Sequence, residues 1–305
     1  MSLIECVPNF SEGRRDSVID TIVSAIQSED IYLLDVSSDA DHNRTVVTFA
    51  GEPEPVLDAC LRGMQMAAET IDLNQHEGVH PRIGATDVVP LIPLRDIDLK
   101  ACATLAAELG ERVGAELKLP VYLYEAAARR PERRNLANIR RGQYEYLRDH
   151  IGTDPEHTPD FGPAQVGPAG AVAIGARNPL IAFNAYLNTT DVTIADRIAR
   201  NMRESSGGLP YVKALGLLVR GRAQVSMNVI DYRQTGLSTI MQQLNTEAAR
   251  QGVTVIETEL VGLAPQAALF DAALACLKLP PPARNQVLEH RLGSVQGDYR
   301  ELPFE

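Results

Sequence analysis

The stretch IYLLDVSSDADHNRTVVTFA, residues 31–50, decides the fold of the first half of the chain. Its two ends, 31–36 and 43–50, are rich in apolar and β-branched residues, and a polar segment separates them, which predicts two strands joined by a loop. The elements expected on either side are a strand at 3–8, a helix at about 14–27 opened by Ser11 and Glu12, a helix at about 54–71 and a strand at 85–93. This β-α-β-β-α-β order is the signature of a ferredoxin-like unit, in which two helices cover one face of an antiparallel sheet.

The second half of the chain repeats this plan. Its expected elements are a strand at 179–187, a helix at 191–204, strands at 212–220 and 222–231, a helix at 237–251 and a strand at 253–261. A further helix near 99–117 and a strand at 121–125 extend the first unit, while residues 126–170 read as irregular. The sequence therefore predicts an α+β protein with two ferredoxin-like subdomains, residues 1–176 and 177–305, each with an antiparallel or mixed sheet covered by helices.

The composition excludes several classes of protein. With 305 residues, 45% hydrophobic residues and 23% charged residues, the chain is long and apolar enough for two cores and is unlike a disordered chain. A formal charge of -11 opposes binding to nucleic-acid phosphates or to an anionic membrane surface. No stretch reaches the roughly 18 consecutive apolar residues of a membrane-spanning helix, and the first residues do not resemble a signal peptide, so we expect a cytoplasmic protein.

The four cysteines lie far apart in the sequence and form no CxxC pair. This spacing indicates neither a disulfide framework nor a thiolate zinc site. Free cysteine behaves as a small hydrophobic side chain, so we expect burial at each of these positions. They are Cys6, Cys60, Cys102 and Cys276.

The string HEGVH, residues 76–80, satisfies the HExxH pattern of zinc metalloproteases. That chemistry requires both histidines on one face of a continuous helix. Here Gly78 interrupts the string and Pro81 follows His80, and the residue before a proline is displaced from helical geometry. We therefore interpret the string as part of a loop and expect no metal; a zinc hydrolase that uses His76 and His80 is the alternative, which metal analysis of the purified protein would test.

The loop around this string, NQHEGVHPRIGATD (74–87), is dense in polar groups and precedes a buried strand, a position where active-site residues often lie. His80 is its best candidate for chemistry, because imidazole accepts and donates protons near neutral pH. Arg82 and Asp87 supply charge nearby. On this reasoning alone, His80 is either an acid/base or a structural loop residue.

Eight stretches together resemble the formiminotransferase domain of the glutamate formimidoyltransferase family, and they span nearly the whole chain. They are ECVPNFSEG (5–13), HNRTVVTF (42–49), HEGVHPRIGATDVVPLIPL (76–94), PVYLYEAAA (120–128), PDFGP (159–163), GARNPLIAFNAYL (175–187), NVIDY (228–232) and ELVGLAP (259–265). One departure stands out. Vertebrate members carry an acidic residue two positions beyond the aspartate of LLDV, where this chain has Ser37, with Asp39 and Asp41 in a different register.

The resemblance implies that the protein transfers a formimidoyl group between N-formimino-L-glutamate and tetrahydrofolate, a step of histidine degradation. Tetrahydrofolate would be the co-substrate, and the protein would be a homodimer with its substrate cleft between the two subdomains. The histidine of the family's HPR step is the catalytic acid/base, which falls on His80. In animals the family domain is fused to a helical cyclodeaminase domain, an activity we do not expect from these 305 residues.

The resemblance also implies a folate-binding segment that is rich in glycine and proline. Its matching positions are Gly162, Pro163, Ala164, Gly167, Pro168, Gly170 and Ala171. The carboxylates of the substrates call for guanidinium partners, since arginine binds a carboxylate through two hydrogen bonds. The candidates for substrate binding are Arg44, Arg82 and Arg177, together with Asn9 and Asn184, which are polar residues among apolar ones.

Two further interpretations of the same family resemblance stay open. The site could instead take 5-formyltetrahydrofolate as donor and pass a formyl group to glutamate, or the protein could bind folate without catalysis. Six arginines form the one basic cluster of this acidic chain, at positions 129, 130, 133, 134, 140 and 141. They could be a solvated surface, or they could attract the polyglutamate tail of folate, which charge reversal of Arg133 and Arg134 would test.

Overall fold

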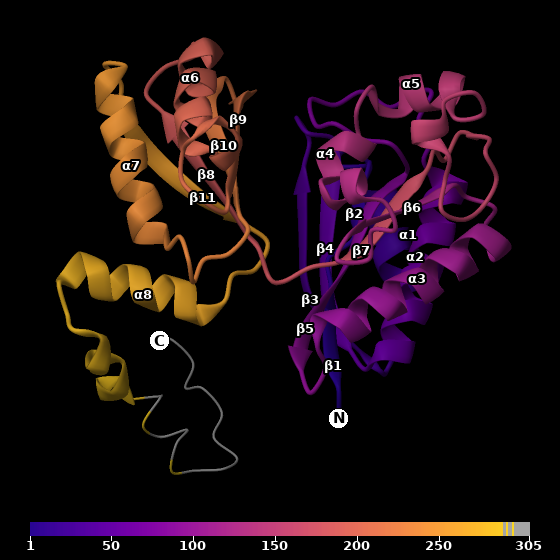
Figure 1. Ribbon diagram of the computed structural model, residues 1–305, viewed down its shortest axis with the longest axis horizontal. Coiled ribbons are helices and arrows are strands. Elements are labelled where there is room, and N and C mark those ends of the chain that lie inside the picture. Colours follow the sequence, from indigo (N-terminus) through magenta and orange to yellow (C-terminus); the bar gives the residue numbers. More distant parts are fainter. Residues whose placement is uncertain (289–290, 292–294, 296–305) are drawn as a thin grey trace. The chain divides into compact units, whose positions relative to one another are not determined.

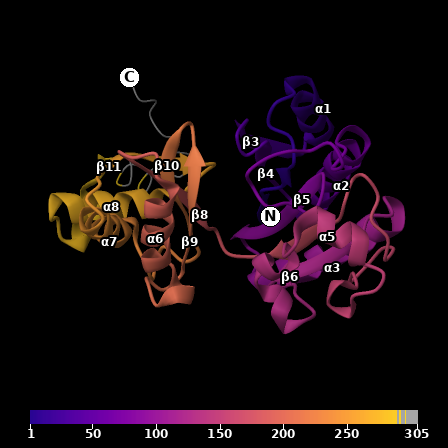
Figure 2. The same cartoon turned by 90° about the horizontal axis from the view of Figure 1, so that it is seen from above.

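The computed structural model describes residues 1–288, 291 and 295 (Figure 1). It divides into two compact units, Met1–Pro179 and Leu180–Glu305. The last part of the expected second subdomain lies outside the described residues. Each unit contains a sheet covered by helices, which confirms the predicted α+β architecture (Figures 1 and 2).

The first unit is built on a seven-stranded sheet. Its strands are β1 (Leu3–Cys6), β2 (Asn9–Phe10), β3 (Ile31–Asp39), β4 (Arg44–Gly51), β5 (Thr86–Arg95), β6 (Val121–Glu125) and β7 (Val172–Ala176). β1 and β2 together lie between β4 and β5, and β3 pairs with the other edge of β4. All of these pairings are antiparallel. This is the predicted ferredoxin-like arrangement.

The prediction missed the strand β7, which extends this sheet. β7 pairs in parallel with both β5 and β6, so the sheet is mixed and wider than a ferredoxin-like unit. The interpretation of 126–170 as irregular was also wrong in part, because the segment contains the short helices α4 (Leu136–Ile139) and α5 (Gln143–His150). These helices are too short for the hydrophobic period to reveal them.

Three helices cover one face of the first sheet (Figure 1): α1 (Asp16–Ile26), α2 (Pro53–Thr70) and α3 (Leu99–Glu116). Ile22 and Ile26 of α1 enter the core with Met64 of α2, and full burial of such a side chain stabilises the fold by roughly 1.5–3 kcal/mol. The first helix begins later than expected. The carboxylate of Glu12 accepts the backbone N–H of Arg14 and Arg15, so the chain enters α1 only at Asp16.

The opposite face of the same sheet carries the short helices at one end. Because strand side chains alternate between faces, Val121 and Leu123 of β6 join the core under α3, while Tyr122 and Tyr124 point to the other side. There they pack with residues of α4 and α5 in a second cluster. This face also carries Arg44 of β4 and therefore the site described below.

The second unit has the predicted β-α-β-β-α-β order. Its elements are β8 (Ile181–Leu187), α6 (Val192–Met202), β9 (Val212–Val219), β10 (Arg222–Val229), α7 (Leu237–Arg250) and β11 (Val255–Val261), followed by α8 (Gln266–Leu277). The strand order β11-β8-β10-β9 is antiparallel throughout, which is the ferredoxin-like topology. The side chains of β8 that point toward α6 and α7, such as Phe183 and Leu187, form the core of this unit.

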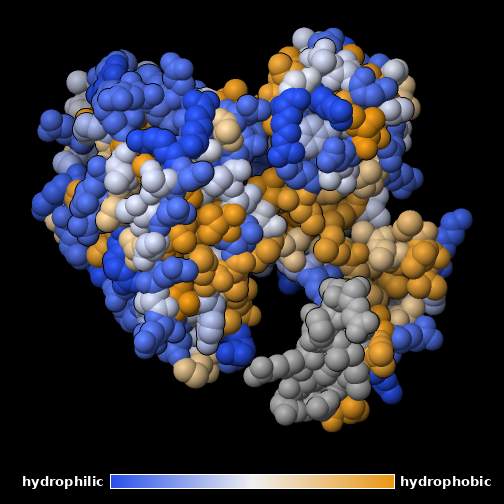
Figure 3. All heavy atoms as spheres, turned by 180° about the vertical axis from the view of Figure 1, so that it is seen from behind, coloured by the Kyte–Doolittle hydropathy of each residue, from blue (hydrophilic) through white to orange (hydrophobic). Residues whose placement is uncertain are grey.

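Some apolar side chains remain exposed in both units, and Figure 3 shows such groups gathered on one face of each. These exposed side chains include Tyr32 and Leu34 of β3 and Leu215 of β9.

Three cysteines are buried as expected, but the expectation was wrong for Cys276, which is exposed on α8. Among the described residues, no helix is long and apolar enough to cross a membrane.

Candidate active site

The HEGVH string lies in a loop between α2 and β5, and the prediction that it is not helical is confirmed. The loop lies against the turn between β3 and β4. At Gly78 an added Cβ atom would lie 2.4 Å from the backbone oxygen of His42, so only glycine allows this approach. Asn43 fixes the contact, since its amide donates to the oxygen of Glu77 at 3.0 Å and accepts the N–H of Gly13 at 2.9 Å.

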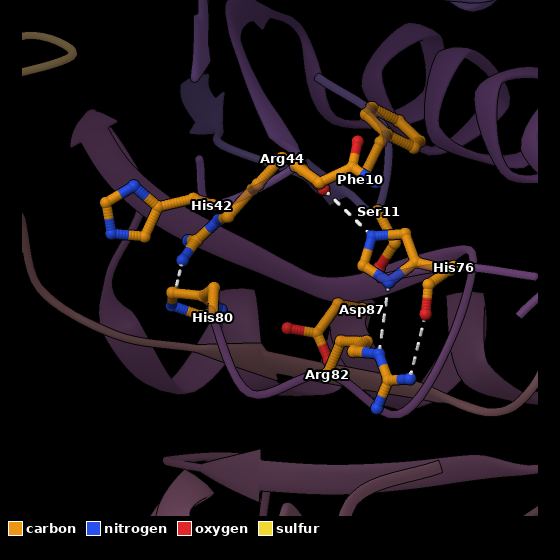
Figure 4. Close-up of a pocket in the computed structure, with 9 residues that line it drawn as sticks. Phe10, Ser11, His42, Arg44, His76, His80, Arg82 and Asp87 are labelled. Atoms are coloured by element: carbon orange, nitrogen blue, oxygen red, sulfur yellow. Dashed lines mark hydrogen bonds between the residues drawn. The ribbon is translucent and has the colours of Figure 1, made fainter. Parts of the chain in front are cut away.

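Beside this contact the first unit has a small, partly open pocket (Figure 4). Its lining residues are Phe10, Ser11, His42, Asn43, Arg44, His76, His80, Arg82 and Asp87. The structure thus brings His80, Arg44 and Arg82, three of the predicted site residues, to one place.

The hydrogen bonds of His80 define which of its nitrogens is basic. Its Nδ1 lies 2.8 Å from the carbonyl oxygen of Pro81, which can only accept a hydrogen bond, so Nδ1 carries the proton. The lone pair is therefore on Nε2, where a guanidinium N–H of Arg44 donates to it (Figure 4). Burial lowers the pKa of His80 well below its ordinary value, and the charges of Arg44 and Arg140 lower it further. His80 is a neutral imidazole.

Arg44 places a guanidinium group in the pocket. None of the carboxylates in the described part of the chain lies within 4 Å of it, and its Nε is buried without a hydrogen-bond partner. Burial lowers the pKa of Arg44 to about 10, helped by the charge of Arg140 and opposed by Asp87. A cation with this much unused hydrogen-bonding capacity is suited to an anionic ligand.

Arg140 and Asp87 form a buried ion pair beside the pocket. The other oxygen of Asp87 accepts the backbone N–H of Ile83 at 2.9 Å, which holds the chain just after the His80 loop. Arg44 and Arg140 thus place two guanidinium groups near His80, and both disfavour a positive charge on its ring.

Arg82 is fully engaged by the protein. Both of its terminal nitrogens bind the carboxylate of Glu145 on α5, at 2.9 and 2.6 Å, and one also donates to Gln143. Its Nε donates to Nδ1 of His76 at 3.2 Å. The guanidinium therefore anchors the loop to α5, and it would have to exchange Glu145 for a substrate carboxylate in order to bind one.

The remaining candidates for substrate binding lie elsewhere. Arg177 directly follows β7 and donates to the backbone oxygen of Asn178, and it does not line the pocket. Asn9 lies in β2 with its amide oxygen buried and without a partner. Asn184 belongs to β8 of the second unit, where its Nδ2 donates to Glu259 at 3.4 Å.

The two ends of the glycine- and proline-rich segment contact different parts of the first unit. Gly170 and Ala171 lie against Ile83 and Gly84, a few residues after His80 in the same loop. The N–H of Ala171 donates to the oxygen of Ile83 at 2.9 Å. Pro168 accepts a hydrogen bond from Leu73 at the start of the same loop. The other end of the segment packs away from the pocket: its residues Gly162, Pro163 and Ala164 follow Phe161, which lies against α3.

The basic cluster is partly internal. Arg133 is 3% exposed and pairs with Asp160, which is buried too, and Arg140 pairs with Asp87. The idea that both Arg133 and Arg134 are solvated is therefore wrong for Arg133. The exposed members are Arg129, Arg134 and Arg141.

No group of three or more histidine, cysteine, aspartate or glutamate side chains is placed to hold a metal within residues 1–288, 291 and 295. Both ring nitrogens of His76 and of His80 contact protein atoms instead. Nε2 of His76 lies 3.0 Å from the oxygen of Asn43, and burial lowers the pKa of His76.

Sequence reasoning missed several residues of the site, among them His42, Asn43 and Glu145. His42 lines the pocket, and Asn43 and Glu145 hold the loop. His42 and Asn43 stand directly before Arg44 in the HNR string, which is the one signal that could have pointed to them. Glu145 carries no such signal, because only the fold brings α5 to the loop.

The fold and the pocket define a two-unit α+β protein in which a neutral imidazole lies beside a guanidinium group. The chain belongs to the formiminotransferase domain family: the N-terminal subdomain of that domain matches residues 3–177, and the family's second region, described as the formiminotransferase domain, matches residues 182–278.

Its similarity to curated proteins extends over nearly its whole length. It is 46% identical to a glutamate formimidoyltransferase of Thermoplasma acidophilum, over 96% of this chain and 98% of the relative. It is 42% identical to a glutamate formimidoyltransferase of Streptococcus pyogenes serotype M1, over 95% of this chain and 98% of the relative. It is 44% identical to the formimidoyltransferase-cyclodeaminase of Mus musculus, over 89% of this chain but 52% of the relative, so it spans about half of that protein.

Proposed function

We propose that this protein transfers the formimidoyl group between N-formimino-L-glutamate and tetrahydrofolate, giving 5-formimidoyltetrahydrofolate and L-glutamate. The observation that carries the proposal is a neutral His80 beside an Arg44 that has no carboxylate partner among the described residues. The names of the relatives and the family membership support the same reaction.

The chemistry needs a base of this kind. As N5 of tetrahydrofolate attacks the formimidoyl carbon, it must lose a proton, and the amine of glutamate must gain one as it departs. His80 has the required lone pair on Nε2, and its depressed pKa keeps it unprotonated at neutral pH. Pro81 holds the ring in the one tautomer that presents Nε2.

The lone pair of His80 is covered by Arg44 and must be released before it can act. A carboxylate of the substrate is a stronger partner for guanidinium than imidazole, because the hydrogen bonds then join opposite charges. Binding of formiminoglutamate would thus draw Arg44 away and free Nε2. In this proposal Arg44 binds the substrate, while Arg82 holds the loop in place through Glu145.

The test is an absorbance assay for 5-formimidoyltetrahydrofolate with the wild type and two variants. His80→Asn should lower kcat by about 10²-fold or more, since a general base contributes about 10²–10⁴ in rate. Arg44→Met should act mainly by raising the KM for formiminoglutamate. Wild-type kcat in His80→Asn would contradict the proposed mechanism, and a wild type without transfer activity would contradict the proposed function.

We also propose that the exposed arginines of the basic cluster attract the polyglutamate tail of folate. Arg133 cannot report on this, because its reversal would break a buried ion pair. Arg134→Glu is the cleaner variant, since the side chain is exposed. It should weaken the binding of polyglutamylated folate more than that of monoglutamylated folate, and equal losses would contradict the idea.

The remaining family expectations are proposals of the same kind. We propose that the protein is a cytoplasmic homodimer and that the glycine- and proline-rich segment Gly162–Ala171 borders folate. The contact of Gly170 and Ala171 with the chain beside the His80 loop supports the second point. Sedimentation analysis tests the dimer, and protection of this segment from hydrogen exchange by bound folate tests the contact.

A further inference from the structure

His42 is a second imidazole in the pocket, and the reaction described above does not use it. It lies in the turn between β3 and β4, and its side chain is 15% exposed. Its ring centroid lies 6.1 Å from that of His80, with the two rings tilted by 59°. Figure 4 shows both rings at the guanidinium end of Arg44.

His42 is oriented by a carboxylate, as acid/base histidines commonly are. Its Nδ1 lies 3.0 Å from Oδ1 of Asp39, and its backbone N–H donates to the same oxygen at 2.7 Å. Although burial opposes ionisation, these hydrogen bonds and the nearby histidine lower the pKa of Asp39. Asp39 is therefore ionised, and it leaves Nε2 of His42 as the nitrogen that can exchange a proton with a substrate.

The two histidines have different partners. His80 has guanidinium neighbours and, among the described residues, no carboxylate partner. His42 has the carboxylate of Asp39 on Nδ1, which leaves Nε2 facing the pocket as its exchangeable position. Two imidazoles of one pocket can serve as a donor and an acceptor of protons in one reaction.

We propose that His42, oriented by Asp39, is a second catalytic residue of the transfer, namely the acid that protonates the departing nitrogen of glutamate. This inference rests on the proposed function and replaces a single shuttling histidine with two. Both rings line the same pocket and their centroids are 6.1 Å apart, so the two imidazoles can contact one small group that enters it.

The proposed step balances in atoms and charge. N5 of tetrahydrofolate forms a bond to the formimidoyl carbon and gives its proton to Nε2 of His80. The bond between that carbon and the glutamate nitrogen breaks, its electron pair stays on nitrogen, and Nε2 of His42 supplies the proton. His80 then holds one proton more and His42 one fewer, and exchange with solvent restores both. No oxidant or further reactant is needed.

The test compares His42→Ala with the wild type in the formimidoyl transfer assay, with tetrahydrofolate binding measured separately. We expect kcat to fall by about 10²-fold, while the KM for formiminoglutamate and the Kd of tetrahydrofolate change little. Added imidazole should restore part of the lost kcat, because it can enter the vacated space and supply the proton. A purely structural role for the turn would not produce such rescue.

Asp39→Asn is the matched variant, since it keeps the His42 ring and removes only the charge that orients it. We expect a tenfold or greater loss of kcat with the circular dichroism spectrum unchanged. The inference fails if His42→Ala keeps kcat within threefold, if its loss lies entirely in KM, or if imidazole restores nothing. Should His42→Ala not fold, wild-type kcat in Asp39→Asn would reject the inference. A wild type that turns over no formiminoglutamate instead rejects the proposed function.

Discussion

The neutral state of His80 predicts how stability depends on pH. In the unfolded chain the pKa of histidine is about 6.5, whereas in the folded protein the pKa of His80 lies well below that value. The unfolded state therefore takes up a proton that the folded state does not, and stability is lost as the pH falls below about 6.5. For one such group the loss is about 0.2 kcal/mol at pH 7 and about 1.4 kcal/mol at pH 5.5.

The variant His80→Asn removes this group and should remove its share of the pH dependence. We expect the difference in unfolding free energy between wild type and variant to change by about 1.2 kcal/mol from pH 7 to pH 5.5, in favour of the variant. Urea denaturation followed by far-ultraviolet circular dichroism at each pH measures the difference. Because His76 and all other titrating groups are common to both proteins, they largely cancel. Parallel curves for the two proteins would refute the reasoning, since they would mean that folding leaves the pKa of His80 unchanged.

Three other substitutions test two ion pairs and one close backbone contact of the first unit. Asp160→Asn leaves the 3%-exposed Arg133 without its carboxylate, so the unfolding free energy should fall by about 3–5 kcal/mol in urea denaturation; a loss below 1 kcal/mol would speak against a buried pair. Gly78→Ala places a Cβ atom 2.4 Å from the oxygen of His42, so transfer activity should fall at least tenfold, and normal activity would disprove the close approach. Glu145→Gln weakens an ion pair whose carboxylate is 55% exposed, so calorimetry should show a loss of about 1 kcal/mol or less.

The sequence was sufficient for elements with a clear period. The strands and helices of the second unit and the antiparallel part of the first sheet follow from alternating or helical apolar patterns. β7 was not predicted because a buried parallel strand lacks the alternation of apolar and polar residues. Its five residues, VAIGA, are all small or apolar. The observed start of α1 is later than the predicted one because Glu12 accepts backbone N–H groups ahead of the helix. A pattern of apolar residues does not contain this information.

The site was predictable where chemistry and backbone signals coincide. His80 stands before a proline in a polar loop, and both its loop position and its place in the pocket follow from that string. The roles of the arginines were not predictable, because arginine binds protein and substrate carboxylates with the same geometry. Only the fold shows that Arg82 already has Glu145 and that Arg44 has none among the described residues.

The positions of the charged side chains around the pocket explain why a chain with a negative net charge can bind an anionic substrate. Two of the six arginines of the basic cluster form internal ion pairs, since Arg133 binds Asp160 and Arg140 binds Asp87. The pair of Arg140 and Asp87 nevertheless raises the cost of charging His80, because Arg140 adds its repulsion to that of Arg44. The same guanidinium groups that attract a carboxylate thus keep the imidazole free of a proton, so anion binding and the neutral state of His80 have one electrostatic origin.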